Sequence, residues 1–214
     1  MVPLVLLASL VVTIDLRSID AALSARVVRG IEAETAAVWR PYGVDIRWVG
    51  GRDRPAVVDV ELTAFVERSA LPPPASARLF ALGAVRLHVD LQTHEPIWIS
   101  YQAVAALLDG RPSDRRMMAT RFQEFADIEM GRALGRVLAH EVGHVILGAP
   151  FHRPAGLMRA RFSADELAAP DRRPFLLTDV DVARLRSRPN SEPRASNPEP
   201  RTPNPDRISA RGPS

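Results

Sequence analysis

The stretch AHEVGHVILGAPFHRPAGLM, residues 139–158, holds three of the five histidines in this chain of 214 residues. Its first part, HEVGH, places His140 and His144 four residues apart, with Glu141 between them. Residues four apart on a helix lie one turn above each other on the same face. A helix here would therefore place two imidazoles where they can bind one metal ion together.

The residues before this motif predict the helix that it needs. From about Phe122 to Leu147, apolar residues recur at helical spacing, and Gly148 is a typical residue to follow a helix end. The apolar face of this helix consists of Met130, Leu134, Val137, Leu138 and Val145. We therefore expect one long helix that carries HEVGH near its carboxyl end.

The position of Glu141 indicates which reaction the motif could catalyse. Two imidazoles one turn apart can share a zinc ion at about 2.0–2.1 Å each. A carboxylate between them can take the proton of a zinc-bound water and pass it to a leaving amine. H-E-x-x-H on a helix is the signature of zinc peptidases, so the motif predicts a zinc metalloendopeptidase with one zinc per chain. The alternative is two histidines solvated on a helix surface.

The composition narrows the possible ligands. The chain has no cysteine, which excludes disulfides, thiolate catalysis and sulfur-ligated zinc. A metal ion must therefore be held by histidine and carboxylate. All 28 basic residues are arginine, so chemistry that needs a lysine is also excluded.

A catalytic zinc needs a third protein ligand and an open position for water. His152 is the nearest candidate, because the chain can turn back after Gly148. Glu166 is the rival, as in gluzincins, where a glutamate on a later helix completes the site. However, Ser163 and Glu166 form a capping-box pattern that would occupy this carboxylate at a helix start. A site with neither residue also stays open.

The order of these residues resembles that of the metzincins, in which H-E-x-x-H-x-x-G-x-x-H precedes a tight turn that carries a methionine. The resemblance implies that His152 is the third ligand and that Met158 forms the Met-turn beneath the metal. Here the loop is two residues longer than in that pattern, because Gly148 and His152 are each four residues after the preceding motif residue. Met158 could also simply pack in the core.

The layout of residues 10–187 is also similar to that of a group of small bacterial zinc peptidases. The similarity rests on PYGVDIRW, on RVLAHEVGHVILG and on a histidine followed by GLMRA. It implies a single peptidase domain, and only the segment 136–160 is specific. A non-catalytic zinc-binding module of the same fold is the alternative function, although it would have no use for Glu141.

The rest of the domain predicts an α+β fold, with a small twisted mixed sheet packed on two main helices. A first helix should stop before Pro41, and Gly43 should turn the chain. We expect strands at residues 11–16, 44–49, 56–63, 84–91 and 96–101. If the strand at 96–101 lies at the sheet edge, an extended peptide could pair with it.

The two ends differ from the domain. Residues 188–214 are rich in proline and arginine and predict a disordered tail. Residues 1–9 begin an apolar stretch that is too short for a stable membrane insertion and fits either a signal-peptide remnant or the start of the first strand. We therefore favour a secreted or periplasmic protein over a cytoplasmic one.

The charge of the chain bears on its partners. The sequence pI of about 10.4 suggests nucleic acid. However, the tail holds five arginines against three acidic residues, which leaves only +1 of the net +3 for residues 1–187. A nearly neutral domain is a poor match for phosphates. We therefore expect a peptide or protein substrate, no nucleic acid, and a monomer.

Overall fold

The computed structural model describes residues 10–50, 58–68, 82–87, 94–110 and 123–188. Within these residues, one sheet of five strands has the order β2-β1-β3-β5-β4. Its strands are β1 (Leu10–Ile19), β2 (Val44–Trp48), β3 (Val60–Glu67), β4 (Gly83–Ala84) and β5 (Ile97–Ser100). All neighbours are parallel except β4, which runs antiparallel to β5. The predicted mixed sheet is confirmed.

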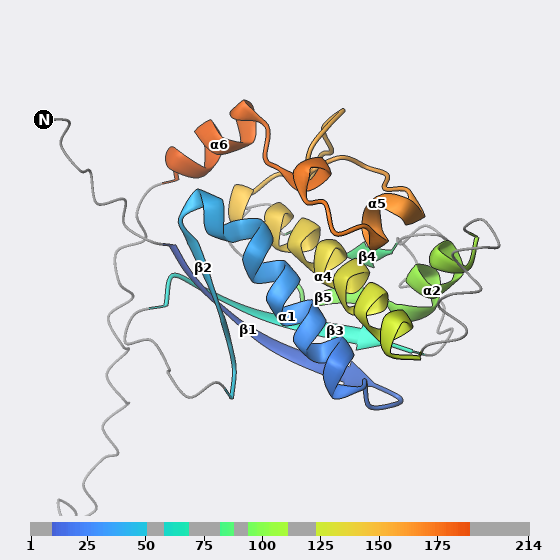
Figure 1. The fold of residues 1–214 in the computed structure, drawn as a ribbon. Helices are drawn as coiled ribbons and strands as arrows, with labels where there is room; N and C mark the ends of the chain where they lie inside the picture. Colours follow the sequence, from blue (N-terminus) through green and yellow to red (C-terminus); the bar gives the residue numbers. More distant parts are fainter. Residues whose placement is uncertain (1–9, 51–57, 69–81, 88–93, 111–122, 189–214) are drawn as a thin grey trace, which may run out of the picture.

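Two long helices, α1 and α4, lie side by side across the same face of the sheet (Figure 1). The helices of the described residues are α1 (Ala25–Trp39), α2 (Tyr101–Asp109), α4 (Gln123–Leu147), α5 (Ala164–Ala168) and α6 (Asp179–Arg186). The predicted α+β class with two main helices is therefore confirmed. None of these helices is long and apolar enough to cross a membrane.

Local sequence explains where α1 begins and where both main helices end. The Ser24 side chain caps α1 by accepting a hydrogen bond from the backbone of Val27. After α1, the short 3₁₀ turn Arg40–Tyr42 leads to Gly43, whose φ of +74° is left-handed. Gly148 ends α4 in the same way, with a φ of +55°, as expected for a residue just after a helix.

Glycines allow α1 and α4 to approach each other closely. A Cβ atom built on Gly131 would lie 2.9 Å from the Cα of Gly30, and one on Gly135 would lie 2.9 Å from the carbonyl oxygen of Ile31. The Trp39 indole N–H also donates to the carbonyl of Ala139, at 3.1 Å. Helix α1 therefore fixes the position of the residue directly before His140.

The core lies between the sheet and these helices, and α4 is buried far beyond its sheet-facing side. The inward strand residues are Val12, Ile14, Leu62, Ala64, Val66, Ile97 and Ile99. Every residue of α4 from Glu129 to Leu147 except Arg132 is buried. The segment after the helix covers its other side, so a helix predicted from one apolar face proves to be enclosed.

Two strand predictions need correction. Residues 88–91 of the expected strand at 84–91 lie outside the described residues; in the described part, Ala84 ends β4 and Leu87 forms an isolated bridge with His94. Strand β5 does not lie at the edge, because β4 pairs with its outer side. The predictions for residues 1–9 and for the tail from residue 189 lie outside the described residues.

Candidate metal centre

The carboxyl half of α4 presents His140 and His144 on one face, with Glu141 beside them. All three side chains are buried. The centre of the helix is held against α1 by the glycine contacts, so the two imidazoles stand on a fixed support. The helical placement predicted from the sequence is present in the structure.

Each helical imidazole is oriented by a backbone carbonyl that follows the helix. The Nδ1 atom of His140 lies 2.7 Å from the oxygen of Leu157, and that of His144 lies 2.5 Å from the oxygen of Ala149. A carbonyl oxygen can only accept, so both Nδ1 atoms carry the proton. In a neutral ring, Nε2 then has a free lone pair.

His152 joins these two residues from the loop after α4. Its ring stacks on that of His140 with centroids 5.3 Å apart, and it meets the ring of His144 edge-on at 5.1 Å. Ligand atoms of the three histidines lie within 4.8 Å of one another. His152 is exposed, whereas the other two are buried. The structure therefore brings together the three histidines predicted from the sequence.

The three histidine rings are in the neutral form, which is the form that binds a metal ion. Burial, and then the nearby His144, lower the pKa of His140 to about 3. Burial also lowers the pKa of His144 and of His152. The rings are therefore neutral near pH 7, and the Nε2 atoms of His140 and His144 face each other at 3.0 Å. Two lone pairs at this distance repel each other unless a cation lies between them.

Glu141 is a buried carboxylate that no described group engages in a hydrogen bond or an ion pair. Burial alone raises the pKa of Glu141 to about 8. Its neighbour is Gly83 in β4, where an added Cβ would lie only 2.9 Å from the Glu141 Oε1 atom. An unpaired buried carboxylate is costly for stability, which suggests a chemical use for it.

Met158 lies against Gly143, the residue directly before His144. It is 1% exposed, and its sulfur would be 2.4 Å from a Cβ added to Gly143. The segment that carries it turns back on itself, because the Arg153 N–H donates to the Met158 carbonyl at 2.7 Å. The glycine within HEVGH therefore leaves room for the methionine.

Glu166, the rival ligand, does not lie with the three histidines. Its side chain accepts a hydrogen bond from the backbone of Ser163, and Ser163 caps α5 in return. The other carboxylate oxygen pairs with Arg159 at 2.8 Å. The capping box predicted from the sequence is confirmed, and both oxygens of this carboxylate are engaged.

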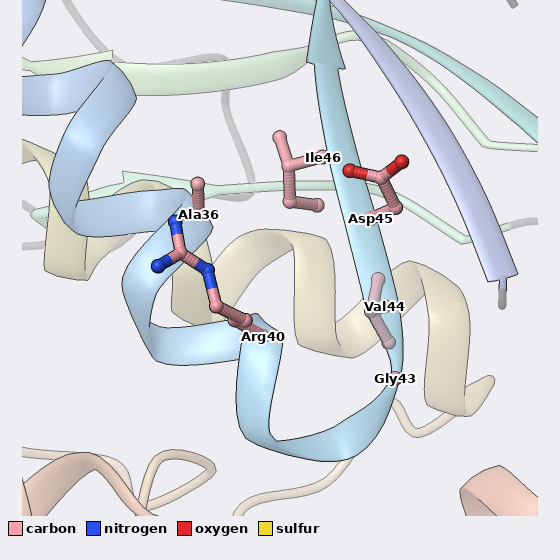
Figure 2. Close-up of a pocket in the computed structure, with 6 residues that line it drawn as sticks. All are labelled: Ala36, Arg40, Gly43, Val44, Asp45 and Ile46. Carbon is pink, nitrogen blue, oxygen red and sulfur yellow. The ribbon is translucent and has the colours of Figure 1, made fainter.

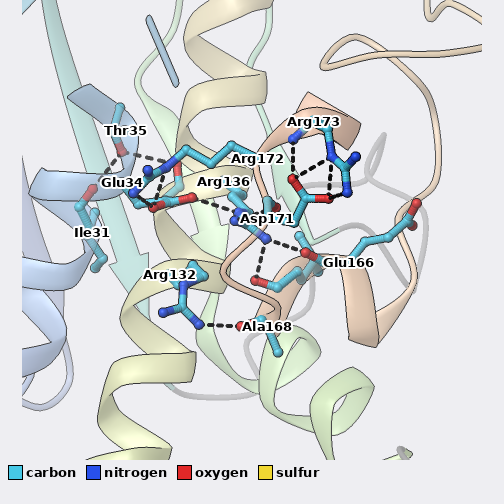
Figure 3. Close-up of polar contacts among 12 residues, drawn as sticks. Ile31, Glu34, Thr35, Arg132, Arg136, Glu166, Ala168, Asp171, Arg172 and Arg173 are labelled. Atoms are coloured by element: carbon cyan, nitrogen blue, oxygen red, sulfur yellow. Dashed lines mark hydrogen bonds and ion pairs between the residues drawn. The ribbon is translucent and has the colours of Figure 1, made fainter. Parts of the chain in front are cut away.

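The sequence analysis missed two arginines that precede the histidines on α4. Four side chains at four-residue spacing on α4 donate to backbone carbonyls of the segment after the helix. They are Arg132, Arg136, His140 and His144. Arg132 donates to Ala168, and Arg136 donates to Glu166, Leu167 and Asp171. His140 donates to Leu157, and His144 donates to Ala149. This donor row fastens the segment to the metal-site helix (Figure 3 shows its arginine half).

Arg136 is the centre of a buried network. It is fully buried and pairs through Nε with Glu34 of α1 at 2.8 Å. The other oxygen of Glu34 pairs with Arg172 at 2.7 Å, as Figure 3 shows. The four-residue spacing of the arginines and histidines was a visible signal, but arginines on a helix are usually at the surface.

A separate pocket of about 270 Å³ lies beside β2, the strand at the sheet edge opposite β4. Its lining combines the end of α1 with the start of β2 and consists of Ala36, Arg40, Gly43, Val44, Asp45 and Ile46 (Figure 2). Because it contains none of the three histidines and β2 is at the far end of the strand order from β4, it is not part of the metal centre.

Comparisons with known proteins give weak likenesses. No protein-family model and no curated protein matches the chain. Archaemetzincin from Methanopyrus kandleri is 14% identical, over 87% of this chain and 97% of its own, with a TM-score of 0.47. A zinc-dependent peptidase from Methanocorpusculum labreanum is 16% identical, over 80% of this chain and 99% of its own, with a TM-score of 0.49. Likenesses this weak carry no conclusion about what the chain binds.

Proposed function

We propose that this chain is a zinc-dependent peptidase in which His140, His144 and His152 hold one zinc ion and Glu141 transfers the proton. One observation carries the proposal: two buried neutral imidazoles face each other through Nε2 at 3.0 Å, and the buried carboxylate between them in the sequence is paired with no described side chain. A metal site explains the first feature, and general base chemistry explains the second.

The donor set fits zinc. Imidazole suits zinc among other first-row metals, and three protein ligands leave the fourth position open for a catalytic reaction. Two nitrogens bound to one tetrahedral zinc at about 2.0–2.1 Å lie about 3.4 Å apart, close to the 3.0 Å between the Nε2 atoms of His140 and His144. The carbonyl partners of their Nδ1 atoms are the kind of outer contact that orients histidine ligands.

Zinc at this position would polarise the carbonyl oxygen of a peptide and lower the pKa of a water molecule. Glu141 would accept one proton from that water as the new C–O bond forms. The same carboxyl group would then donate the proton to the amine nitrogen as the C–N bond breaks. No described side chain pairs with Glu141, so within the described residues nothing competes for the two proton transfers.

The edge strand β4 offers a place for an extended peptide. Its Gly83 backbone lies against Glu141, and β4 is the last strand on this side among the described residues. A peptide that adds to a sheet edge gains backbone hydrogen bonds independent of its sequence. We propose that substrate pairs here rather than with β5.

The third histidine in a loop after the helix, followed by a buried methionine under Gly143, supports a metzincin-like arrangement with a Met-turn at Met158. Of the two additional residues, one falls between His144 and Gly148 and the other between Gly148 and His152. They lengthen the path of the chain to the third ligand without altering the helical pair.

The test is the substitution Glu141→Gln, which keeps the shape of the side chain but cannot accept the proton. We expect the variant to bind one zinc per chain and to fold as the parent does. Hydrolysis of a diverse peptide pool should fall by at least about 10²–10⁴-fold. A chelator-treated parent is the control that shows that cleavage depends on the metal.

Two outcomes would contradict the proposal. If Glu141→Gln cleaves peptides as fast as the parent, the role assigned to Glu141 is wrong. If the zinc-loaded parent, with and without residues 189–214, cleaves nothing in the pool, the chain is better described as a non-catalytic zinc-binding module.

A further inference from the structure

His140 has a ring neighbour besides its metal-site partners. The ring of Phe162 meets the His140 ring edge-on, with centroids 5.6 Å apart. Among the described residues, His140 is the one of the three histidines whose ring contacts a phenylalanine, and Phe162 comes from the segment that follows Met158. A half-buried phenylalanine therefore forms one wall of the metal centre.

Phe162 does not stand alone, because it stacks on the fully buried Phe175. The two rings are 5.1 Å apart and inclined by 22°. Each ring is covered by one guanidinium: Arg136 lies 4.4 Å from the centre of Phe175, and Arg159 lies 4.7 Å from the centre of Phe162. Such contacts favour one ring orientation over others.

Both ends of this aromatic pair are held by the same helix. Arg136 and His140 are one turn apart on α4, a rise of roughly 6 Å. That rise is close to the 5.1 Å between the two phenylalanine rings, so consecutive turns of α4 contact consecutive rings. Arg136 is itself fixed by Glu34 and by backbone carbonyls.

The arrangement restricts the rotation of the His140 ring. Leu157 fixes the ring through Nδ1, but one hydrogen bond still allows the ring plane to tilt. The Phe162 ring blocks the tilt from the side, and Phe175 behind it prevents Phe162 from moving away. The Nε2 lone pair of His140 is therefore kept directed at His144 and His152.

We propose that Phe162 is a positioning residue of the metal centre, acting on zinc affinity through the ring of His140. This inference rests on the zinc site of the proposed function and adds a residue to it. Removing an outer contact of a metal-binding histidine typically lowers metal affinity by 10–100-fold. Because Phe162 makes a ring contact rather than a hydrogen bond, we expect the low end of that range.

The test compares Phe162→Leu with the parent in two measurements. Zinc affinity is measured by competition with a chromophoric chelator, and we expect a loss of about tenfold. The visible spectrum of the cobalt-substituted protein reports on ligand geometry, and we expect its bands to shift. The separate variant Phe162→Tyr keeps the ring, so it should have the same zinc affinity and the same cobalt spectrum as the parent.

The matched control is Phe151→Leu. Phe151 directly precedes the third ligand His152, is 45% exposed, and has ring contacts with Arg153 and Arg184. Its loss removes an aromatic ring from the neighbourhood without touching His140, so zinc affinity should stay at the parent value. If Phe162→Leu does not fold, Phe162→Met, which fills a similar volume without a ring, replaces it.

The outcomes separate this inference from the function that it rests on. A folded Phe162→Leu variant with parent zinc affinity and parent cobalt spectrum refutes the positioning role, even if its thermal midpoint falls. An equal loss of affinity in Phe151→Leu refutes it as well. A parent that binds no zinc in the same titration refutes the metal centre itself, and the positioning role with it.

Discussion

Two ion pairs join the same two helices and differ in burial, and the carboxylate of the buried pair also holds the half-exposed Arg172. Glu34 of α1 pairs with Arg136 of α4, with side chains 5% and 0% exposed. Arg26 of α1 pairs with Glu124 of α4, with side chains 41% and 77% exposed. Removing the carboxylate from each pair therefore compares a buried and an exposed ion pair within one helix contact.

We expect Glu34→Ala to lower the free energy of unfolding by about 3–5 kcal/mol, because it leaves the buried Arg136 charge without a counter-ion. Arg136 keeps its hydrogen bonds to the carbonyls of Leu167 and Asp171, so the loss should lie near the low end of this range. Glu124→Ala should cost about 0–1 kcal/mol, since water screens an exposed pair.

The assay is urea unfolding of the metal-free proteins at pH 7, followed by circular dichroism. Measuring without metal keeps changes in zinc affinity out of the comparison. Glu34→Gln keeps the volume and one acceptor oxygen, so it should lose less stability than Glu34→Ala. The reasoning is refuted if Glu34→Ala and Glu124→Ala differ by less than about 1 kcal/mol.

Other substitutions and one truncation test three further features. His152→Ala should lower zinc affinity by orders of magnitude while Glu166→Ala keeps it, as metal analysis of the purified proteins would show; the reverse pattern would favour the gluzincin-like site. Gly143→Ala should destabilise the fold by about 1–3 kcal/mol through its clash with Met158. Adding Met158→Ala should make the combined loss smaller than the sum of the single losses, whereas strict additivity in thermal unfolding would count against the contact. A chain that ends at Arg188 should keep its thermal midpoint and its zinc, and a drop of several degrees in calorimetry would show that the tail packs on the domain.

The parts of the fold that local sequence determines were predictable. The periodic apolar residues before Leu147 predicted α4, and Gly148 predicted its end. The capping-box pattern at Ser163 predicted the start of α5. These signals work because each depends on residues within one or two turns of one another.

The order of the strands was not predictable in the same way. Strand β4 is only two residues long and has no alternation of its own, and its position outside β5 depends on chain paths that local sequence does not encode. Consequently the sequence did not show which strand lies at the edge, although the three histidines that it singled out do lie together.

The surroundings of the histidines were the other part that sequence reasoning missed. Arg136 is fully buried because Glu34, 102 positions earlier in the chain, meets it across the helix contact. Phe162 and Phe175 stack across 12 intervening residues. Such contacts arise only when the segment after the metal site folds back over α4.

The donor row on α4 also limits which changes in chain length the protein can tolerate. Inserting one residue between Arg132 and His144 would rotate every later donor by about 100° around the helix axis, away from its carbonyl. The loop between Gly148 and His152 is less constrained, because after Ala149, whose carbonyl accepts from His144, only its end must reach the other two histidines. Natural insertions and deletions near the metal centre should therefore accumulate in this loop and be absent from the helix.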